Sequence, residues 1–155
     1  MSYNLLFVCT GNTCRSPMSE ALARHAIRER GWSGVEVASA GVAALAGSPA
    51  SAEVPRVLEE LGVEAPAHEA RELTPERVEW ADAVLVMGPS HAAAAEAMGG
   101  AGKVAMVTEY LPGEDAGQPV MDPIGGGLGV YRDTRDQLRA AIDAFLDRIQ
   151  PIVAP

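Results

Sequence analysis

The segment of residues 9–16, with the sequence CTGNTCRS, places a cysteine and an arginine six positions apart. A cysteine thiolate is a strong nucleophile, and a guanidinium group presents two N–H donors that match two phosphate oxygens. The segment follows the apolar residues 5–8 and precedes Pro17, which the first turn of a helix tolerates. A nucleophilic Cys9 and an anion-binding Arg15 are therefore expected in one loop between a strand and a helix.

Such a loop is suited to phosphate chemistry. Backbone N–H groups at the start of a helix lack partners and, together with the helix dipole, form an anion site. The same positive field favours the thiolate of Cys9, to which Ser16 can donate a hydrogen bond. We expect Cys9 to attack phosphorus and form a cysteinyl-phosphate, while Arg15 and the loop bind the equatorial oxygens of the transition state. The expected substrate-binding residues are Thr10, Gly11, Asn12, Thr13, Cys14 and Ser16.

Other interpretations of the loop are open at this point. Two buried cysteines and a surface arginine can flank a glycine turn without any function, since Cys-x5-Arg is a short pattern. A nucleotide-binding P-loop fits less well, because the lysine of Gly-x4-Gly-Lys-Ser/Thr is missing. A zinc site is not expected, because the two cysteines and the scattered His25, His68 and His91 do not match a zinc-ligand spacing.

The segment VCTGNTCRSP and nearly the whole chain resemble the low-molecular-weight protein-tyrosine phosphatases. In that family the residue matching Asn12 maintains the strained shape of the phosphate loop, helped by residues that match Ser39 and His68. Considered alone, Ser39 would be an ordinary strand-end residue and His68 a partly exposed loop histidine. His25 and His91 match no catalytic residue of the family, and we expect both to be solvated on helices.

The resemblance also implies a general acid, because the family carries one in an Asp-Pro pair just before the last helix. Asp122 and Pro123 form such a pair in a glycine-rich segment. A carboxyl group there would protonate the leaving group and then accept a proton from the attacking water. Without the resemblance, an Asp-Pro pair is a common start of a turn. Some members have a further acidic residue where this chain has Gly88, so no accessory acid is expected there.

Thr13 bears on the choice of substrate. Tyrosine-directed members have a bulky aliphatic residue at this position and often aromatic residues after the Asp-Pro pair, whereas this chain has Thr13 and Ile124. The loop is similar to the branch that hydrolyses phosphoarginine in proteins. A threonine hydroxyl can bond a polar group beside the phosphorus, while a branched aliphatic side chain would crowd a guanidinium group. Phosphoarginine is favoured over phosphotyrosine, although Ile124 offers no flat wall for a guanidinium group.

Cys14 is the second of only two cysteines. In the family that the chain resembles, the pair matching Cys9 and Cys14 forms a reversible disulfide, so Cys14 is expected to trap an oxidised Cys9. From the residues alone, a small apolar residue packed under the helix is the slightly favoured interpretation of Cys14. Thiol-dependent arsenate reductases share the fold, but the later cysteines that they need are missing here. A non-catalytic phosphate-binding module is not favoured, because Cys9 and Asp122 are both present.

Strands and helices alternate along the chain. Strands are expected at residues 5–8, 35–38, 83–87 and 103–107, and helices at residues 18–30, 51–61, 90–98 and 130–149, with another helix starting at residues 74–77. This alternation predicts a single α/β domain over residues 1–155 with a mostly parallel sheet and helices on both faces. The phosphate loop would lie at the carboxyl end of the first strand, where such sheets bind ligands.

The overall charge excludes some partners. Twelve Lys and Arg against 21 Asp and Glu give a net charge of −9, which opposes attraction to nucleic acids and to anionic membranes. The first residues lack the pattern of a secretory signal, and no stretch approaches the about 20 apolar residues of a membrane span. We expect a cytoplasmic enzyme that uses no cofactor or metal, takes phosphorylated proteins as substrates and releases inorganic phosphate.

Overall fold

The apolar residues near the N-terminus form the central strand of a parallel sheet. The computed structural model describes residues 2–155, and its four strands are arranged in the order β2-β1-β3-β4. The strands are β1 (Tyr3–Cys9), β2 (Val35–Gly41), β3 (Ala83–Val86) and β4 (Val104–Met106). Strand β1 has a neighbour on each side and helices over each face, so Leu5, Leu6, Phe7 and Val8 are fully buried. This burial explains the unbroken apolar run in the sequence.

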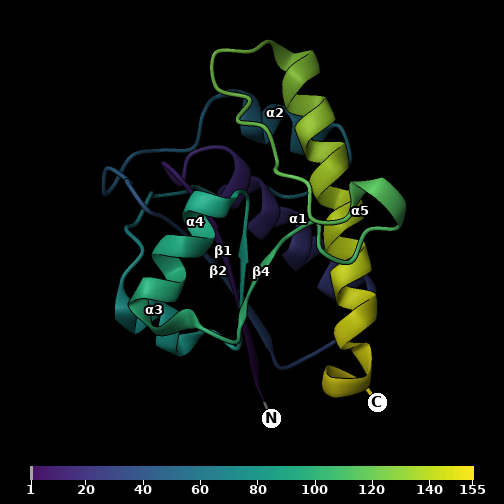
Figure 1. Ribbon diagram of the computed structural model, residues 1–155. Helices are drawn as coiled ribbons and strands as arrows, with labels where there is room; N and C mark the ends of the chain where they lie inside the picture. The colour runs from purple at the N-terminus through teal and green to yellow at the C-terminus, as the bar shows by residue number, and fades with distance from the viewer. Residues whose placement is uncertain (1) are drawn as a thin grey trace.

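Helices cover both faces of the sheet (Figure 1). They are α1 (Arg15–Glu29), α2 (Glu53–Glu59), α3 (Pro75–Trp80), α4 (Pro89–Ala95) and α5 (Leu128–Val153), with a π-helical turn η1 (Glu96–Gly100) and a 3-10 turn η2 (Gly113–Asp115). Leu5 and Phe7 pack in the core with α1, α2 and α5, whereas Leu6 and Val8 pack with α3 and α4. The predicted fold class is therefore confirmed.

The bounds of several elements differ from the prediction, and two of these differences concern the loop after β1. Helix α1 begins at Arg15, three residues earlier than expected, and the amide of Met18 donates to the carbonyl oxygen of Cys14 at 3.1 Å. Strand β2 continues to Gly41, which pairs with Cys9 at the end of β1. Both extensions bring structured backbone directly against the loop. Within residues 2–155, no helix is both long and apolar enough to cross a membrane.

The carboxyl ends of the parallel strands lie at one edge of the sheet. The connection after β1 leads to β2 on one side, and the connection after β2 leads to β3 on the other side of β1. The loop after β1 approaches the end of β2 so closely that a Cβ atom on Gly41 would lie 2.5 Å from the carbonyl oxygen of Thr10. The segment before α5 reaches the same edge, because the amide of Val120 donates to the carbonyl oxygen of Met87 at 2.9 Å. Segments from both halves of the sequence therefore meet at this edge.

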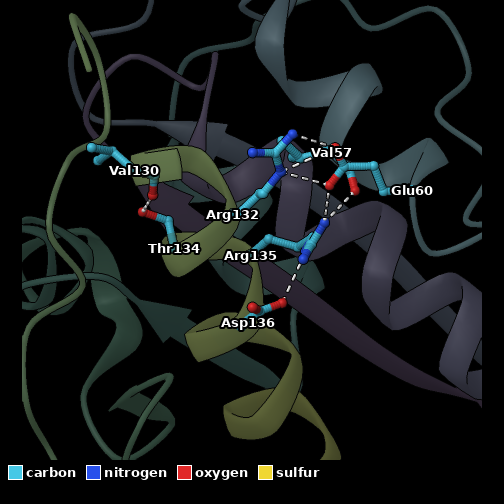
Figure 2. A network of polar contacts seen from close by, with 7 residues as sticks. All are labelled: Val57, Glu60, Val130, Arg132, Thr134, Arg135 and Asp136. Atoms are coloured by element: carbon cyan, nitrogen blue, oxygen red, sulfur yellow. Dashed lines mark hydrogen bonds and ion pairs between the residues drawn. The ribbon is translucent and has the colours of Figure 1, made fainter. Parts of the chain in front are cut away.

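A network of ion pairs fastens α2 to the first turns of α5 (Figure 2). Glu60, at the end of α2, accepts hydrogen bonds from Arg132 Nη2 and from Arg135 Nη1, each at 2.7 Å. Arg135 is buried and also donates to the carbonyl oxygen of Val57 and to Asp136, each at 2.9 Å. The hydrogen bonds from Arg132 and Arg135 lower the pKa of Glu60 to about 2. This network holds the beginning of α5, the helix that follows the glycine-rich segment.

Glu60→Gln is expected to lower the thermal stability of the protein, most strongly near neutral pH. The pKa of Glu60 falls from 4.5 to about 2 on folding, so the carboxylate stabilises the fold above about pH 4.5 and this contribution is lost as the pH falls towards about 2. The difference in Tm between the parent and Glu60→Gln, measured by circular dichroism, should shrink over that range. Glu59→Gln at the neighbouring exposed residue is the control. A Tm difference that does not change with pH would contradict this role of the charge.

Candidate active site

Cys9 ends β1 with its sulfur atom beside the start of α1. The Sγ atom lies 2.9 Å from Ser16 Oγ, and both side chains are buried. Ser16 Oγ accepts a hydrogen bond from Asn12 Nδ2 at 2.8 Å, so its own proton is available to another acceptor. The carbonyl oxygen of Ala40 is farther from it, at 3.5 Å, than the sulfur of Cys9. Ser16 is thus placed to donate a hydrogen bond to the sulfur atom of Cys9.

The loop after Cys9 presents unpaired backbone N–H groups. Within residues 2–155, the N–H groups of residues 10–14 have no protein acceptor. The loop leads directly into α1, whose N-terminus is the positive end of the helix dipole. Unpaired N–H groups beside a helix N-terminus form an anion site. The loop is therefore able to bind a phosphate group next to the sulfur of Cys9.

Asn12 is the residue on which the shape of the loop depends. It has a positive φ of 56°, and asparagine is one of the few non-glycine residues that adopt this conformation readily. Its side chain is fully buried: Nδ2 donates to Ser16 and to Ser39 Oγ, at 2.8 and 2.9 Å, and Oδ1 accepts from the amide of Arg71 at 3.0 Å. His68 Nε2 donates to the carbonyl oxygen of Asn12 at 2.7 Å. The structure therefore brings Ser39 and His68 together at Asn12.

Two parts of this support have no counterpart among the residues that we expected from the sequence. Ser39 Oγ donates to Glu20 Oε1 at 2.6 Å, so a carboxylate on α1 orients the serine. At Gly41, a Cβ atom would lie 2.8 Å from the amide nitrogen of Asn12, so only glycine fits without a shift of the loop. Glu20 gives no recognisable signal in the sequence, because Glu20 and Arg24 form the i,i+4 pair of an ordinary helix surface.

The guanidinium group of Arg15 lies between the loop and the segment before α5. Arg15 is buried, and its Nη1 donates to the carbonyl oxygen of Val120 at 2.9 Å. Its Nη2 donates to Thr10 Oγ1 at 3.4 Å and lies 3.8 Å from Asp122 Oδ2. These contacts place the cation and the carboxylate side by side. The contact with Val120 could not be expected from the sequence, because a backbone carbonyl carries no residue-type signal.

Asp122 lies at the rim of the site, on the segment that joins η2 to α5. Its side chain is 44% exposed, and its Oδ1 accepts a hydrogen bond from the amide of Ile124 at 3.1 Å. Met121 and Ile124, on either side of the Asp-Pro pair, are among the most exposed large apolar side chains of the protein. The carboxyl group is therefore accessible to a substrate and is held in an Asx turn beside Arg15.

Cys14 faces away from solvent into a small polar cluster. Its Sγ atom lies 3.0 Å from Ser51 Oγ and 3.5 Å from the hydroxyl group of Tyr131, and its side chain is buried. Burial and the contact with Cys14 raise the pKa of Tyr131 to about 12. Thr13 is partly exposed, with its Oγ1 3.9 Å from Cys14 Sγ. Tyr131 lies in the helix expected at residues 130–149, and its hydroxyl contact with Cys14 depends on the packing of α5 against the loop.

The prediction that His91 is a solvated helix residue is wrong. His91 is 3% exposed, and its Nε2 lies 2.9 Å from Thr10 Oγ1 in the phosphate loop. Burial and the nearby Arg15 lower the pKa of His91. The residue lies in the first turn of α4, directly after the carboxyl end of β3, and this position was the available signal. His25 is partly exposed on α1 and faces Glu29 at 3.5 Å.

The functional groups of the site determine which reaction it can catalyse. A thiol, a guanidinium group, unpaired N–H groups and a carboxyl group adjoin one another at the carboxyl edge of the sheet. Such a set can transfer a phosphoryl group to sulfur and then to water. Among residues 2–155, no group of three or more His, Cys, Asp or Glu side chains is arranged to hold a metal ion.

The chain is similar in sequence to a family model and to several known proteins, all of which are described as phosphatases. A family model described as low molecular weight phosphotyrosine protein phosphatase matches residues 4–153. A protein-arginine-phosphatase of Geobacillus stearothermophilus is 42% identical over 152 residues, covering 97% of this chain and 98% of the relative. The probable low molecular weight protein-tyrosine-phosphatase EpsP of Ralstonia solanacearum is 34% identical over 152 residues, covering 98% and 99%.

A solved structure is also similar. A mutant of the YwlE arginine phosphatase with a phosphorylated active site serine matches with a TM-score of 0.88 at 35% identity, covering 96% of this chain and 97% of that one. The resemblance and the enzyme class that the sequence predicted are confirmed by these matches, which do not favour an arsenate reductase. The chain is a phosphatase that belongs to the low molecular weight phosphotyrosine protein phosphatase family.

Proposed function

We propose that this protein removes phosphate from phosphorylated arginine side chains of proteins, through a phosphoryl group carried by Cys9. The observation that carries the proposal is the position of the Cys9 sulfur, 2.9 Å from Ser16 Oγ and at the start of a loop with unpaired N–H groups. The similar YwlE arginine phosphatase mutant has a phosphorylated active site serine, which supports a phosphoryl group on the residue at this place.

In the first step, the Cys9 thiolate attacks phosphorus while the bond from phosphorus to the leaving atom breaks. Arg15 and the N–H groups of residues 10–14 bind the equatorial oxygens, on which negative charge increases in the transition state. Asp122 donates a proton to the leaving nitrogen or oxygen atom. The products of this step are a cysteinyl-phosphate and either an arginine side chain, which is a guanidinium cation, or a neutral tyrosine side chain.

In the second step, water replaces the departed side chain. The Asp122 carboxylate accepts a proton from this water as its oxygen attacks phosphorus, and the bond between sulfur and phosphorus breaks. The sulfur leaves as a thiolate, which the hydroxyl group of Ser16 stabilises from 2.9 Å. Inorganic phosphate is released, and the enzyme returns to its starting state.

The choice of phosphoarginine rests on Thr13 and on the relatives. The Geobacillus stearothermophilus relative at 42% identity is a protein-arginine-phosphatase, whereas the relative at 34% is a probable tyrosine phosphatase. Thr13 is partly exposed in the loop, so its hydroxyl group can bond a polar substrate atom. Phosphotyrosine is the second candidate, because the apolar Met121 and Ile124 at the rim can pack against an aromatic ring.

Turnover on matched phosphoarginine and phosphotyrosine peptides tests the proposal, and Thr13→Ile tests its cause. We expect the parent to prefer phosphoarginine and Thr13→Ile to reduce the ratio of kcat/KM values by about 10-fold or more, because the branched side chain crowds the guanidinium group. Thr13→Val separates the loss of the hydroxyl group from the added bulk. A parent that prefers phosphotyrosine, or an unchanged ratio in Thr13→Ile, would assign the preference to other residues.

We also propose that Cys14 protects the nucleophile from oxidation. Peroxide would convert the Cys9 thiolate to a sulfenic acid, and the Cys14 thiol would attack this sulfur, forming a disulfide and releasing water. To do so, Cys14 must leave its contacts with Ser51 and Tyr131. Activity lost to peroxide should return with a dithiol in the parent but not in Cys14→Ser. Equal recovery of both proteins would exclude this role.

A further inference from the structure

We propose that His91 is a positioning residue for phosphoryl transfer, which acts through Thr10 to hold the guanidinium group of Arg15 in its reactive orientation. The inference rests on the proposed phosphatase function and extends it to a helix outside the loop of residues 9–16. It assigns His91 no contact with the substrate. The inference rests on two successive hydrogen bonds, one between the ring of His91 and the hydroxyl group of Thr10 and one between Thr10 and Arg15.

In the part of the chain that the structure describes, the buried ring of His91 makes a single polar contact. Its Nε2 lies 2.9 Å from Thr10 Oγ1, whereas its Nδ1 is buried and has no hydrogen-bond partner within residues 2–155. Burying a polar atom without a partner is unfavourable, so an apolar residue would fill this place in α4 at lower cost. The hydrogen bond between Nε2 and Thr10 therefore explains why an imidazole occupies this position.

Thr10 needs such a partner, because it lies in an exposed part of the loop. A threonine hydroxyl has one proton and two lone pairs, and an exposed one can turn between rotamers towards water. Arg15 Nη2 can only donate, so Thr10 Oγ1 is the acceptor of that bond, at 3.4 Å. The second bond, to His91, fixes the hydroxyl group in the orientation that accepts from Arg15.

The guanidinium group of Arg15 then has two hydrogen-bonded anchors, in addition to the Asp122 carboxylate 3.8 Å from Nη2. Nη1 donates to the carbonyl oxygen of Val120 at 2.9 Å, and Nη2 donates to Thr10. One anchor would leave the plane free to tilt, whereas two define it. The plane must match two oxygens of the phosphoryl group in the transition state, where a displacement of about 1 Å can cost about 100-fold in rate. Loss of the hydrogen bond to Thr10 is therefore expected to slow the reaction more than it weakens binding of the substrate.

The charge state of His91 suits this role. Burial and the positive charge of Arg15 lower the pKa of His91, and the Asp122 carboxylate raises it to a lesser extent. A neutral ring places no second positive charge beside the guanidinium group and forms the bond to Thr10 in either tautomer. His91 thus acts as a hydrogen-bonding group, and Asp122 remains the proposed acid.

Three substitutions at His91 separate the hydrogen bond from the packing. Glutamine reaches about as far as Nε2 and can donate or accept, whereas asparagine ends near the position of Nδ1 and cannot reach Thr10. Leucine keeps the volume and removes the polarity. With an aryl phosphate as substrate, we expect kcat to fall about 10- to 100-fold in His91→Asn and His91→Leu with KM within about threefold, and kcat to stay within about threefold of the parent in His91→Gln.

A double-mutant cycle tests whether Thr10 carries the effect. Thr10→Val removes the hydroxyl group at nearly constant shape and should lower kcat by about the same factor as His91→Leu. The double variant should be no slower than either single variant. Losses that multiply in the double variant would overturn the proposal, and so would full activity in His91→Leu. If His91→Leu does not fold, the comparison of His91→Gln with His91→Asn gives the same decision.

An NMR measurement tests the proposal without catalysis. The N–H signals of the Arg15 guanidinium group should show slow rotation in the parent and in His91→Gln, and faster averaging in His91→Asn. Equal rotation in the two variants would overturn the proposal. Failure of the proposed function would look different, because the parent itself would then show no turnover of the aryl phosphate while the Arg15 signals still distinguished the variants.

Discussion

Cys9→Ser should lower steady-state turnover of any phosphate monoester or phosphoarginine peptide by at least about 10,000-fold, because a serine hydroxyl is not ionised at neutral pH and leaves poorly from phosphorus. The substitution keeps the small side chain between β1 and α1, and the unpaired N–H groups of residues 10–14 remain. Phosphate binding should therefore persist, measured by calorimetry or by the 31P NMR signal.

The matched control for this prediction is Cys14→Ser, the same chemical change in the same loop. This variant should retain most of the activity under reducing conditions, because Cys14 contacts Ser51 and Tyr131 and is not proposed as the nucleophile. Any phosphoryl group that reaches the serine of Cys9→Ser should stay there and be detectable by mass spectrometry. Multiple turnovers by Cys9→Ser, or a phosphorylated residue elsewhere, would remove Cys9 from the role of nucleophile.

Asp122→Asn should slow the reaction in proportion to the basicity of the leaving group. A basic leaving atom needs a proton as its bond breaks, and general acid catalysis contributes about 100- to 10,000-fold. We expect losses in this range for phenyl phosphate and phosphoarginine, but a much smaller loss for a nitrophenyl phosphate, whose leaving group is stable as an anion. The slope of log kcat/KM against leaving-group pKa, measured over a series of aryl phosphates, should become steeper.

The structure shows why asparagine is a suitable replacement here. The Oδ1 atom of Asp122 accepts from the amide of Ile124, and an asparagine oxygen can do the same, so the turn should be preserved. Asp115→Asn, in η2 on the exposed segment before the site, is the matched control and should leave the slope unchanged. Equal losses for all leaving groups in Asp122→Asn would show that Asp122 orients Arg15, 3.8 Å away, and does not deliver the proton.

The sequence by itself determined the elements whose signals are local. The apolar run of residues 5–8 predicted the central strand, and the loop followed by Pro17 predicted the start of a helix, although α1 begins earlier, at Arg15. Alternating strands and helices predicted the parallel α/β fold, because parallel strands need crossover connections. The positions of Ser39, His68 and Asp122 came from the family resemblance, since each residue type is ordinary in a strand end, a loop or a turn. The cytoplasmic location stays a prediction.

Only the tertiary structure decided which residues support the site from a distance. Val120 and Tyr131 contact the loop directly, and Glu20 supports it through Ser39. They do so because the ends of β1, β2 and β3 and the helices α1 and α5 converge there, and no spacing in the sequence records this convergence. The histidine in α4 was expected to be solvated, because it matches no catalytic residue of the family and lies in an alanine-rich helix. Its burial and its bond to Thr10 depend on how α4 packs against the sheet next to β1, a contact between residues 81 positions apart. Local patterns fix what a segment can form, whereas the strand order fixes which segments meet.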